Sequence, residues 1–144
     1  NVTFAETEDG IVGMVSGYTA AQHRKSTRQP LEQAAGRFNL RYALVSALLA
    51  PLFRIIDTVA DGDYYIQAIA VDDQHRGKGV GSVLLHAVEE RARAAGSTGL
   101  ALDVSASNGN ARRVYEHRGW SIESRWPRRV PIPKVKLLRM RKAL

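Results

Sequence analysis

The order of apolar and polar residues along the chain predicts short strands in its first part. Residues 2–8 and 11–18 flank the turn dipeptide Asp9-Gly10, and this arrangement predicts a β-hairpin. Residues 64–71 (YYIQAIAV) are apolar on both faces, which is typical of a strand in the middle of a sheet.

The second half of the chain predicts a β–α–β unit and further strands. Apolar residues at helical spacing predict a helix that begins near Val80, and Gly96 is a suitable stop for it. A buried strand is expected at 100–105 and a shorter helix at 110–117. The closing strands are expected at 120–126 and 135–142. Together these elements predict an α+β sandwich around a mixed sheet.

The segment 20–62 is harder to place. Pro30 is suited to open a helix, which Pro51 would kink or end. The apolar stretch 42–53 is too short to cross a bilayer. We therefore expect residues 40–56 to cover an acceptor cleft, to pair two subunits in a homodimer, or to complete the core.

Composition narrows the class of protein. The chain has 144 residues, which suits one domain over 1–144. It has no cysteine, which excludes disulfides, thiolate zinc sites and a cysteine nucleophile and fits a cytoplasmic protein. The four histidines show no metal-ligand spacing, so no metal is expected. The chain begins at Asn1 within an expected strand, and we expect one or two elements of the natural protein to precede it.

The net charge of +7 is unevenly distributed. Residues 1–111 hold 10 Lys and Arg against 12 Asp and Glu, whereas residues 112–144 hold 11 against 2. The last part of the chain therefore favours an anionic partner: a nucleic acid, an anionic membrane or a phosphorylated cofactor. We expect most of its cations, Arg139 and Arg141 included, to lie on solvated strand and loop faces.

A glycine-rich loop follows the strand at 64–71 and opens the helix near Val80. Three glycines in five residues expose backbone amides, and the first turn of a helix is an anion site. A P-loop is excluded because Gly79 follows Lys78, and the dinucleotide fingerprint is excluded because Leu84 replaces its third glycine. The candidate phosphate-binding residues are Arg76, Gly77, Lys78, Gly79, Val80, Gly81 and Ser82.

Two motifs in order resemble one family. Arg76-x-x-Gly79-x-Gly81 resembles the Gln/Arg-x-x-Gly-x-Gly/Ala signature of the GNAT superfamily of acyl-CoA N-acyltransferases, which lies between the fourth strand and its helix. A second motif resembles the Asn-x-x-Ala-x-x-x-Tyr-x-x-x-Gly-Phe pattern that follows the fifth strand of that family. In this chain it reads Asn108, Ala111, Tyr115, Gly119 and Trp120.

The resemblance covers residues 64–144 and the hairpin at 2–18, but not 20–62, which is a long insertion between strands. It implies a three-layer α/β/α sandwich with a mixed, mostly antiparallel sheet and an acyl-CoA-binding core at 64–120. On this resemblance, we expect the first strand and first helices of the family to be absent from this chain.

The resemblance also implies an N-acetyltransferase with acetyl-CoA as cosubstrate and a small-molecule or protein amine as acceptor. The backbone near Ala70 and Val71 would pair with the pantetheine arm, and the amides at 77–82 would hold the pyrophosphate. Asn108 would reach the pantetheine, and Arg112 would lie near the phosphates.

For catalysis, the resemblance implies that Tyr115 protonates the departing thiolate. Many relatives carry a glutamate base on the fourth strand, where this chain has Gln67, which cannot accept a proton. Asp103 is the best substitute as a base, although a structural hydrogen bond would equally explain it. A water chain, or an amine with a lowered pKa, would need no carboxylate.

Two functions of other classes stay open at this point. Gln67 in place of the glutamate would suit a non-catalytic acyl-CoA-binding protein. The basic last third would suit a nucleic-acid-binding module, which is disfavoured because only Trp120 and Trp126 are available there for base stacking.

Overall fold

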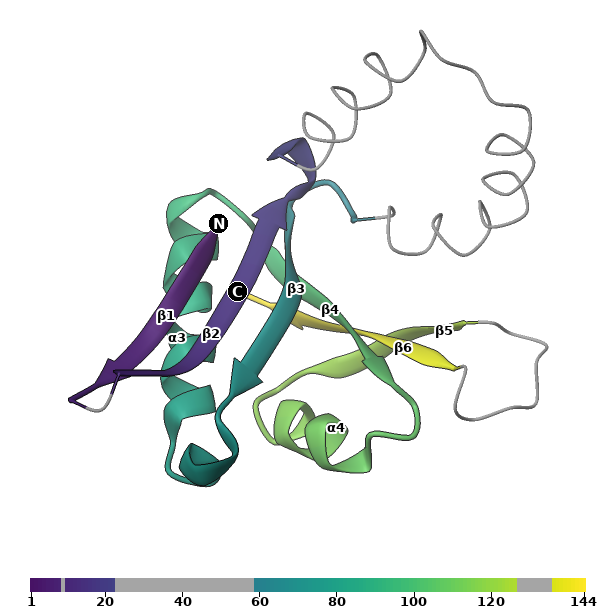
Figure 1. The fold of residues 1–144 in the computed structure, drawn as a ribbon. Helices are drawn as coiled ribbons and strands as arrows, with labels where there is room; N and C mark the ends of the chain where they lie inside the picture. The colour runs from purple at the N-terminus through teal and green to yellow at the C-terminus, as the bar shows by residue number, and fades with distance from the viewer. Residues whose placement is uncertain (9, 23–58, 127–135) are drawn as a thin grey trace, which may run out of the picture.

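A mixed β-sheet organises the chain in the computed structural model, which describes residues 1–8, 10–22, 59–126 and 136–144 (Figure 1). Six strands form this sheet in the order β1-β2-β3-β4-β6-β5. Their bounds are β1 Val2–Thr7, β2 Gly10–Thr19, β3 Asp63–Val71, β4 Gly99–Ser105, β5 Ser121–Trp126 and β6 Leu137–Ala143. The helices are α3 (Val80–Ala94) and α4 (Gly109–Glu116), and a 3₁₀ turn spans Asp73–His75.

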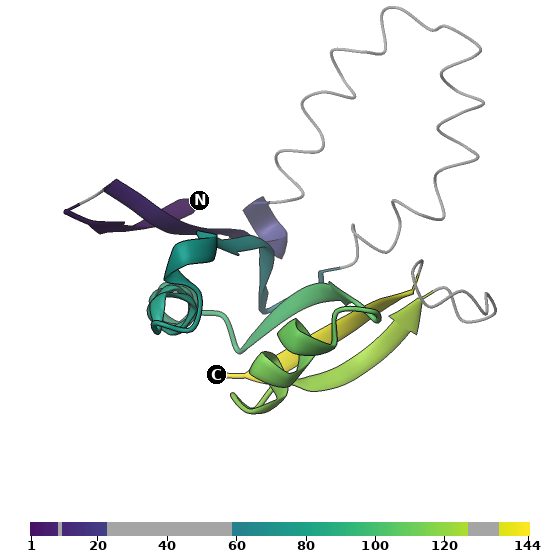
Figure 2. The same cartoon turned by 60° about the horizontal axis from the view of Figure 1, so that its bottom comes forward.

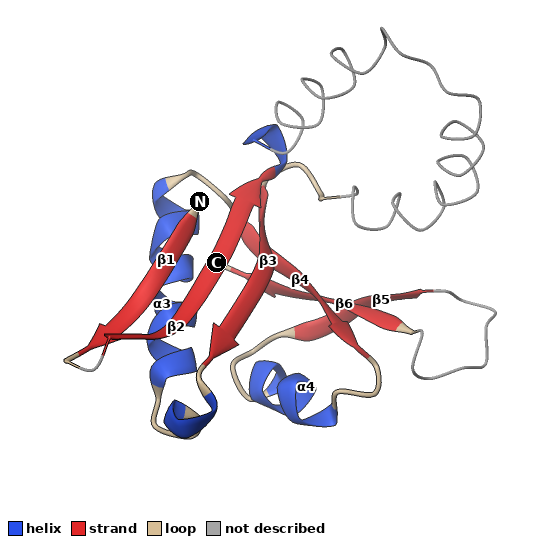
Figure 3. Cartoon of the chain, in the orientation of Figure 1, coloured by secondary structure: helices blue, strands red, loops and turns tan. Residues whose placement is uncertain are grey.

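The pairing of the strands is antiparallel except at one place, and it bears out the mixed, mostly antiparallel sheet. β3 and β4 are parallel and pair only from Asp63 with Gly99 to Ile66 with Leu102. The crossover between these two strands is α3, as the β–α–β pattern predicts (Figure 3). Beyond Ile66, β3 continues to Val71 beside β2 alone.

Both described helices pack on the same hydrophobic cluster. α3 contributes Leu84, Leu85, Val88 and Ala92, and α4 contributes Tyr115. In Figure 2, α3 is seen along its axis, and α4 lies against the part of the sheet formed by β4, β6 and β5. Leu138 and Met140 of β6 complete the cluster from the sheet side. These positions recur at helical spacing in α3 and at every second residue in β6, so burial of one face explains each element.

The strands and helices that the sequence predicts in these ranges are confirmed, with bounds that shift by one or two residues. The helix that the sequence predicts after Pro30 falls within residues 23–58, which lie outside the described part of the chain. The expectations for residues 40–56 therefore lie outside it as well. Among the described helices, none is both long enough and apolar enough to span a membrane.

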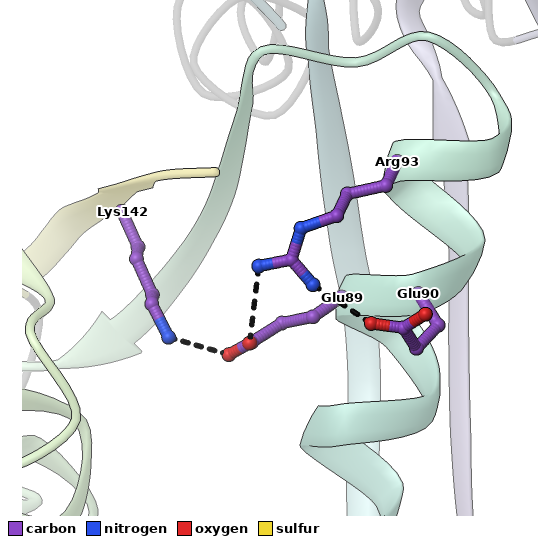
Figure 4. A network of polar contacts seen from close by, with 4 residues as sticks. All are labelled: Glu89, Glu90, Arg93 and Lys142. Atoms are coloured by element: carbon purple, nitrogen blue, oxygen red, sulfur yellow. Dashed lines mark hydrogen bonds and ion pairs between the residues drawn. The ribbon is translucent and has the colours of Figure 1, made fainter.

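One expectation about β6 is wrong: its cations are not simply solvated. Arg139 is buried and paired with Asp103, and Arg141 is paired with the buried Asp63. The third pair joins Lys142 of β6 to Glu89 of α3 at 2.6 Å (Figure 4). Because each cation meets a carboxylate, the positive charge of β6 is largely neutralised within the fold.

Candidate active site

The two parallel strands separate in the middle of the sheet, and a wedge opens between them. Gln67 has no partner on β2, because Ser16 pairs with Ala68 and Gly17 with Ile66. This extra residue is a β-bulge, which shifts the alternation of side chains by one. The shift shows in the core, where Ile66 on one side of the bulge and Ile69 on the other face the same cluster.

A cavity of about 320 Å³ occupies the wedge. Its walls are β3 from Ile66 to Ile69 and β4 from Leu102 to Ser105. Asn108, Ala111 and Tyr115 close it from the side of α4. Gln67 and Asp103 therefore face one space from opposite strands.

A groove of about 710 Å³ adjoins the wedge. It runs between the end of β3, the glycine-rich loop, the first turn of α3 and one side of α4. The groove and the wedge share Ile69, Asn108, Ala111 and Tyr115 as lining residues. We treat them as one continuous cleft, with the glycine-rich loop at one end and the separated strands at the other.

The glycine-rich loop adopts a backbone that side chains oppose. Gly77 and Gly79 have φ values of 75° and 89°, in the left-handed region that favours glycine. Ser82 and Val83 both donate their backbone N–H to the carbonyl of Gly79. In the described residues, the N–H groups of Gly79 and Gly81 find no backbone acceptor. The first turn of α3 thus presents free donors to the groove.

The charges of the groove are positive. Its lining includes Arg76, His75 and Arg118 and contains no Asp or Glu. Arg76 pairs with the exposed Asp73 at 2.7 Å, and His75 contacts Asp72 through Nδ1 at 2.9 Å. That contact is the main reason why the pKa of Asp72 is lowered. Arg118 instead donates to the hydroxyl of Ser82.

Asn108 and Tyr115 stand where the groove meets the wedge. The Asn108 side chain caps α4 by accepting a hydrogen bond from the N–H of Ala111 at 3.1 Å. Tyr115 is buried and packs on Trp120 with ring centroids 5.7 Å apart. Burial raises the pKa of the Tyr115 hydroxyl, which therefore stays protonated at neutral pH.

Asp103 is held by a buried network. Arg139 donates two hydrogen bonds to its carboxylate, at 2.7 and 2.8 Å, and the Tyr65 hydroxyl donates a third at 2.9 Å. Arg139 also lies over the Tyr65 ring, 5.3 Å from its centroid. Burial, reinforced by the charge of Asp103, raises the pKa of Tyr65, and the hydrogen bond to Asp103 raises the pKa of Arg139.

The structure brings most of the residues singled out in the sequence into this cleft. The groove is lined by Ala70, Val71, Arg76, Gly77, Gly79, Gly81, Ser82, Asn108 and Tyr115, and the wedge by Asp103. Lys78, Val80 and Arg112 are not among the lining residues, and Arg112 lies 3.4 Å from Glu116 on its own helix. Sequence reasoning missed His75, Asn110, Val114 and Arg118. Arg118 comes 36 residues after its partner Ser82, so no local pattern indicates the contact.

The sequence model of the Acetyltransferase (GNAT) family matches residues 2–120. The chain therefore belongs to the GNAT acetyltransferase family, and it is a transferase enzyme. No curated protein matches the sequence.

Solved structures share the fold. Ard1 from Thermoplasma volcanium superposes with a TM-score of 0.63 at 18% identity, over 98% of this chain and 68% of that chain. Nourseothricin acetyltransferase gives 0.63 at 19% identity, over 99% and 64%. The ribosomal-protein-S18-alanine N-acetyltransferase from Escherichia coli gives 0.62 at 15% identity, over 99% and 68%. At these identities the likeness concerns the fold.

Proposed function

We propose that this acetyltransferase moves the acetyl group of acetyl-CoA to a primary amine of a small molecule or a protein, by direct attack of the amine on the thioester. The observation that carries the proposal is the continuous cleft, which joins a positively charged loop of free amides to a wedge between two strands. An elongated donor with phosphates at one end and a reactive group at the other fits such a cleft. We further propose that residues 1–144 act as one catalytic domain in the cytoplasm.

The groove supports binding of the donor. The free amides at Gly79 and Gly81, with the positive end of α3 behind them, suit a diphosphate. Past Ile66, β3 has lost its β4 partner, so the backbone near Ala70 and Val71 is available to a pantetheine arm as it would be to an added strand. Asn108 lies on the opposite wall of the groove, within the same space.

The wedge supports the chemistry. Past Ile66 the backbone of β3 faces the wedge without a β4 partner, so an amide of this stretch is available to the thioester oxygen, where negative charge develops as the amine attacks. When the carbon–sulfur bond breaks, Tyr115 donates its hydroxyl proton to the leaving thiolate. A hydroxyl that burial keeps protonated is suited to that role.

The amine must lose a proton before or during attack, and we infer that water accepts it. Gln67 has no basic group, and both oxygens of Asp103 already accept hydrogen bonds from Arg139. We therefore favour a structural role for Asp103 over the role of base. The ion pairs of β6 also favour an enzyme of small or peptidic amines over a nucleic-acid-binding surface.

The test is release of free CoA thiol from acetyl-CoA across polyamines, aminoglycosides, arylalkylamines, amino acids and peptide N-termini. We expect release that depends on one class of amine, with the acetylated amine identified by mass spectrometry. Acetyl-CoA without amine is the control for hydrolysis. Binding of acetyl-CoA without amine-dependent release in any class would contradict the proposal.

A further inference from the structure

Arg118 differs from the other basic side chains of the groove in its partner. Arg76 and His75 each have a carboxylate beside them, Asp73 and Asp72. The side-chain partner of Arg118 in the described residues is the neutral hydroxyl of Ser82. A guanidinium carries several N–H donors, so one bond to a hydroxyl leaves both charge and donors for a ligand.

The place of Arg118 in the fold puts that charge beside the free amides. Arg118 lies in the turn between α4 and β5, and its backbone N–H donates to the carbonyl of Tyr115 at 2.8 Å. Ser82 lies in the first turn of α3, directly after Gly81. The contact between them therefore joins the two walls of the groove where the loop amides are exposed.

We propose that Arg118 binds the diphosphate of the acyl donor, from the wall opposite the glycine-rich loop. The inference rests on the proposed function, because it assigns a residue to the donor in that same cleft. The Ser82 hydroxyl holds the guanidinium over the groove, and a diphosphate bound to the amides of α3 accepts hydrogen bonds from it. Planar, charge-assisted pairing with phosphate oxygens is the contact for which arginine is best suited.

This assignment gives Arg118 the phosphate-binding role that the sequence suggests for Arg112. Arg112 lies within the second motif, as Arg118 does, but it is paired with Glu116 and does not line the groove. Arg118 is three residues beyond Tyr115, which reaches the wedge. Residues one turn apart would therefore contact the two ends of the donor: Arg118 the diphosphate and Tyr115 the thioester.

The experiment measures binding of CoA and 3′-dephospho-CoA by calorimetry, and of pantetheine by NMR titration. The variants are Arg118→Gln and Arg118→Lys. The matched control for loss of one charge is Arg125→Gln, because Arg125 is an exposed residue of β5 that does not line the groove. We expect Arg118→Gln to weaken both nucleotides roughly 10- to 100-fold, the range for loss of a hydrogen bond to a charged group. Arg118→Lys should recover part of the loss, while Arg125→Gln should bind like the parent and pantetheine should bind all of them alike.

Each other outcome is decisive. Equal binding of CoA by the parent and Arg118→Gln overturns the assignment. Loss confined to CoA would place Arg118 on the 3′-phosphate and overturn the diphosphate contact. Equal weakening of pantetheine would make the Arg118–Ser82 contact a structural tie between α3 and the turn after α4. A parent that binds none of the three would overturn the proposed function together with this inference.

Discussion

Asp103 of β4 and Arg139 of β6 lie directly opposite each other on neighbouring strands. They form a bidentate ion pair that is almost fully buried, with each side chain 9% exposed. The pair forms one wall of the wedge, since Asp103 lines that cavity. The ion pair therefore links the shape of this cavity to the pairing of β4 with β6.

Asp103→Asn is expected to lower the free energy of unfolding by about 3–5 kcal/mol, because it leaves the Arg139 guanidinium buried without its counter-charge. Urea denaturation measures the loss. The control is Asp73→Asn, which breaks the exposed pair with Arg76 and should change stability by less than about 1 kcal/mol. Unchanged stability of Asp103→Asn, together with a loss of turnover at unchanged affinity for acetyl-CoA, would instead identify Asp103 as the base.

Gly81→Val tests the groove without straining the backbone, and valine is chosen because the family signature allows alanine at this position. Gly79 is less informative for this purpose, because any side chain there is strained at a φ of 89°. At Gly81 a Cβ would meet only Val71 Cγ2, at 3.7 Å, and would lie in the groove wall. We expect affinity for acetyl-CoA to fall by roughly tenfold or more in Gly81→Val, since crowding a filled space with extra carbon atoms costs about 1–3 kcal/mol.

The matched control for Gly81→Val is Gly109→Val in the first turn of α4, where a Cβ meets nothing within 4 Å. Both changes replace a helical glycine by valine and should change stability by less than about 1 kcal/mol. Calorimetry with acetyl-CoA should separate them. Equal affinity in the two variants would show that the donor does not approach the first turn of α3.

Tyr115→Phe should lower turnover by roughly 10²- to 10⁴-fold, the usual contribution of a positioned acid. The ring and its contact with Trp120 remain, so thermal stability and affinity for acetyl-CoA should stay near those of the parent. Steady-state kinetics and a thermal shift measure the two effects separately. A variant that turns over at the parent rate, with chemistry rate-limiting, would return Tyr115 to a packing role.

Stability at high pH should depend on Tyr65. Its folded-state pKa is raised above the ordinary value of 10 by burial, so the stabilisation is fully present below pH 10 and is lost as pH rises through the folded pKa. Above pH 10, this tyrosine should steepen the fall in unfolding free energy by up to about 1.4 kcal/mol per pH unit. Urea denaturation of the parent and Tyr65→Phe between pH 8 and 11 should therefore give curves that converge, and parallel curves would argue against a buried, protonated Tyr65.

Much of the fold follows from local patterns. Asp9-Gly10 marks the first hairpin, the apolar spacing from Val80 marks α3, and these elements form where the sequence predicts them. The loop at one end of the cleft is equally visible in the sequence, because its three glycines lie within five residues. Two of them, Gly77 and Gly79, have backbone angles that favour glycine. Such features depend on interactions between near neighbours in the chain, which a sequence displays directly.

The other end of the cleft depends on distant pairs. Asp63 meets Arg141 across 78 residues of chain, and both Asp103–Arg139 and Ser82–Arg118 span 36. Strand order brings the two acid–arginine pairs together, because β6 lies next to β4 and β4 next to β3, whereas Ser82 and Arg118 meet where α3 approaches the turn after α4. The bulge at Gln67 is also hidden, since a strand with apolar residues on both faces shows no break in its alternation. Hence the glycine-rich loop and its place before α3 could be predicted, and the environment of Asp103 and the contact of Arg118 with Ser82 could not.

The position of β6 also has a consequence for the order in which the enzyme is built. β6 is inserted between β4 and β5, although both precede it in the chain. A ribosome that has translated only as far as β5 has therefore made every residue that lines the groove and the wedge, while Asp103 still lacks Arg139 and the edge of β4 is open. Open strand edges invite pairing with other chains. Arrival of β6 closes that edge, brings Leu138 and Met140 to the cluster on which α4 packs, and gives Asp103 its counter-charge.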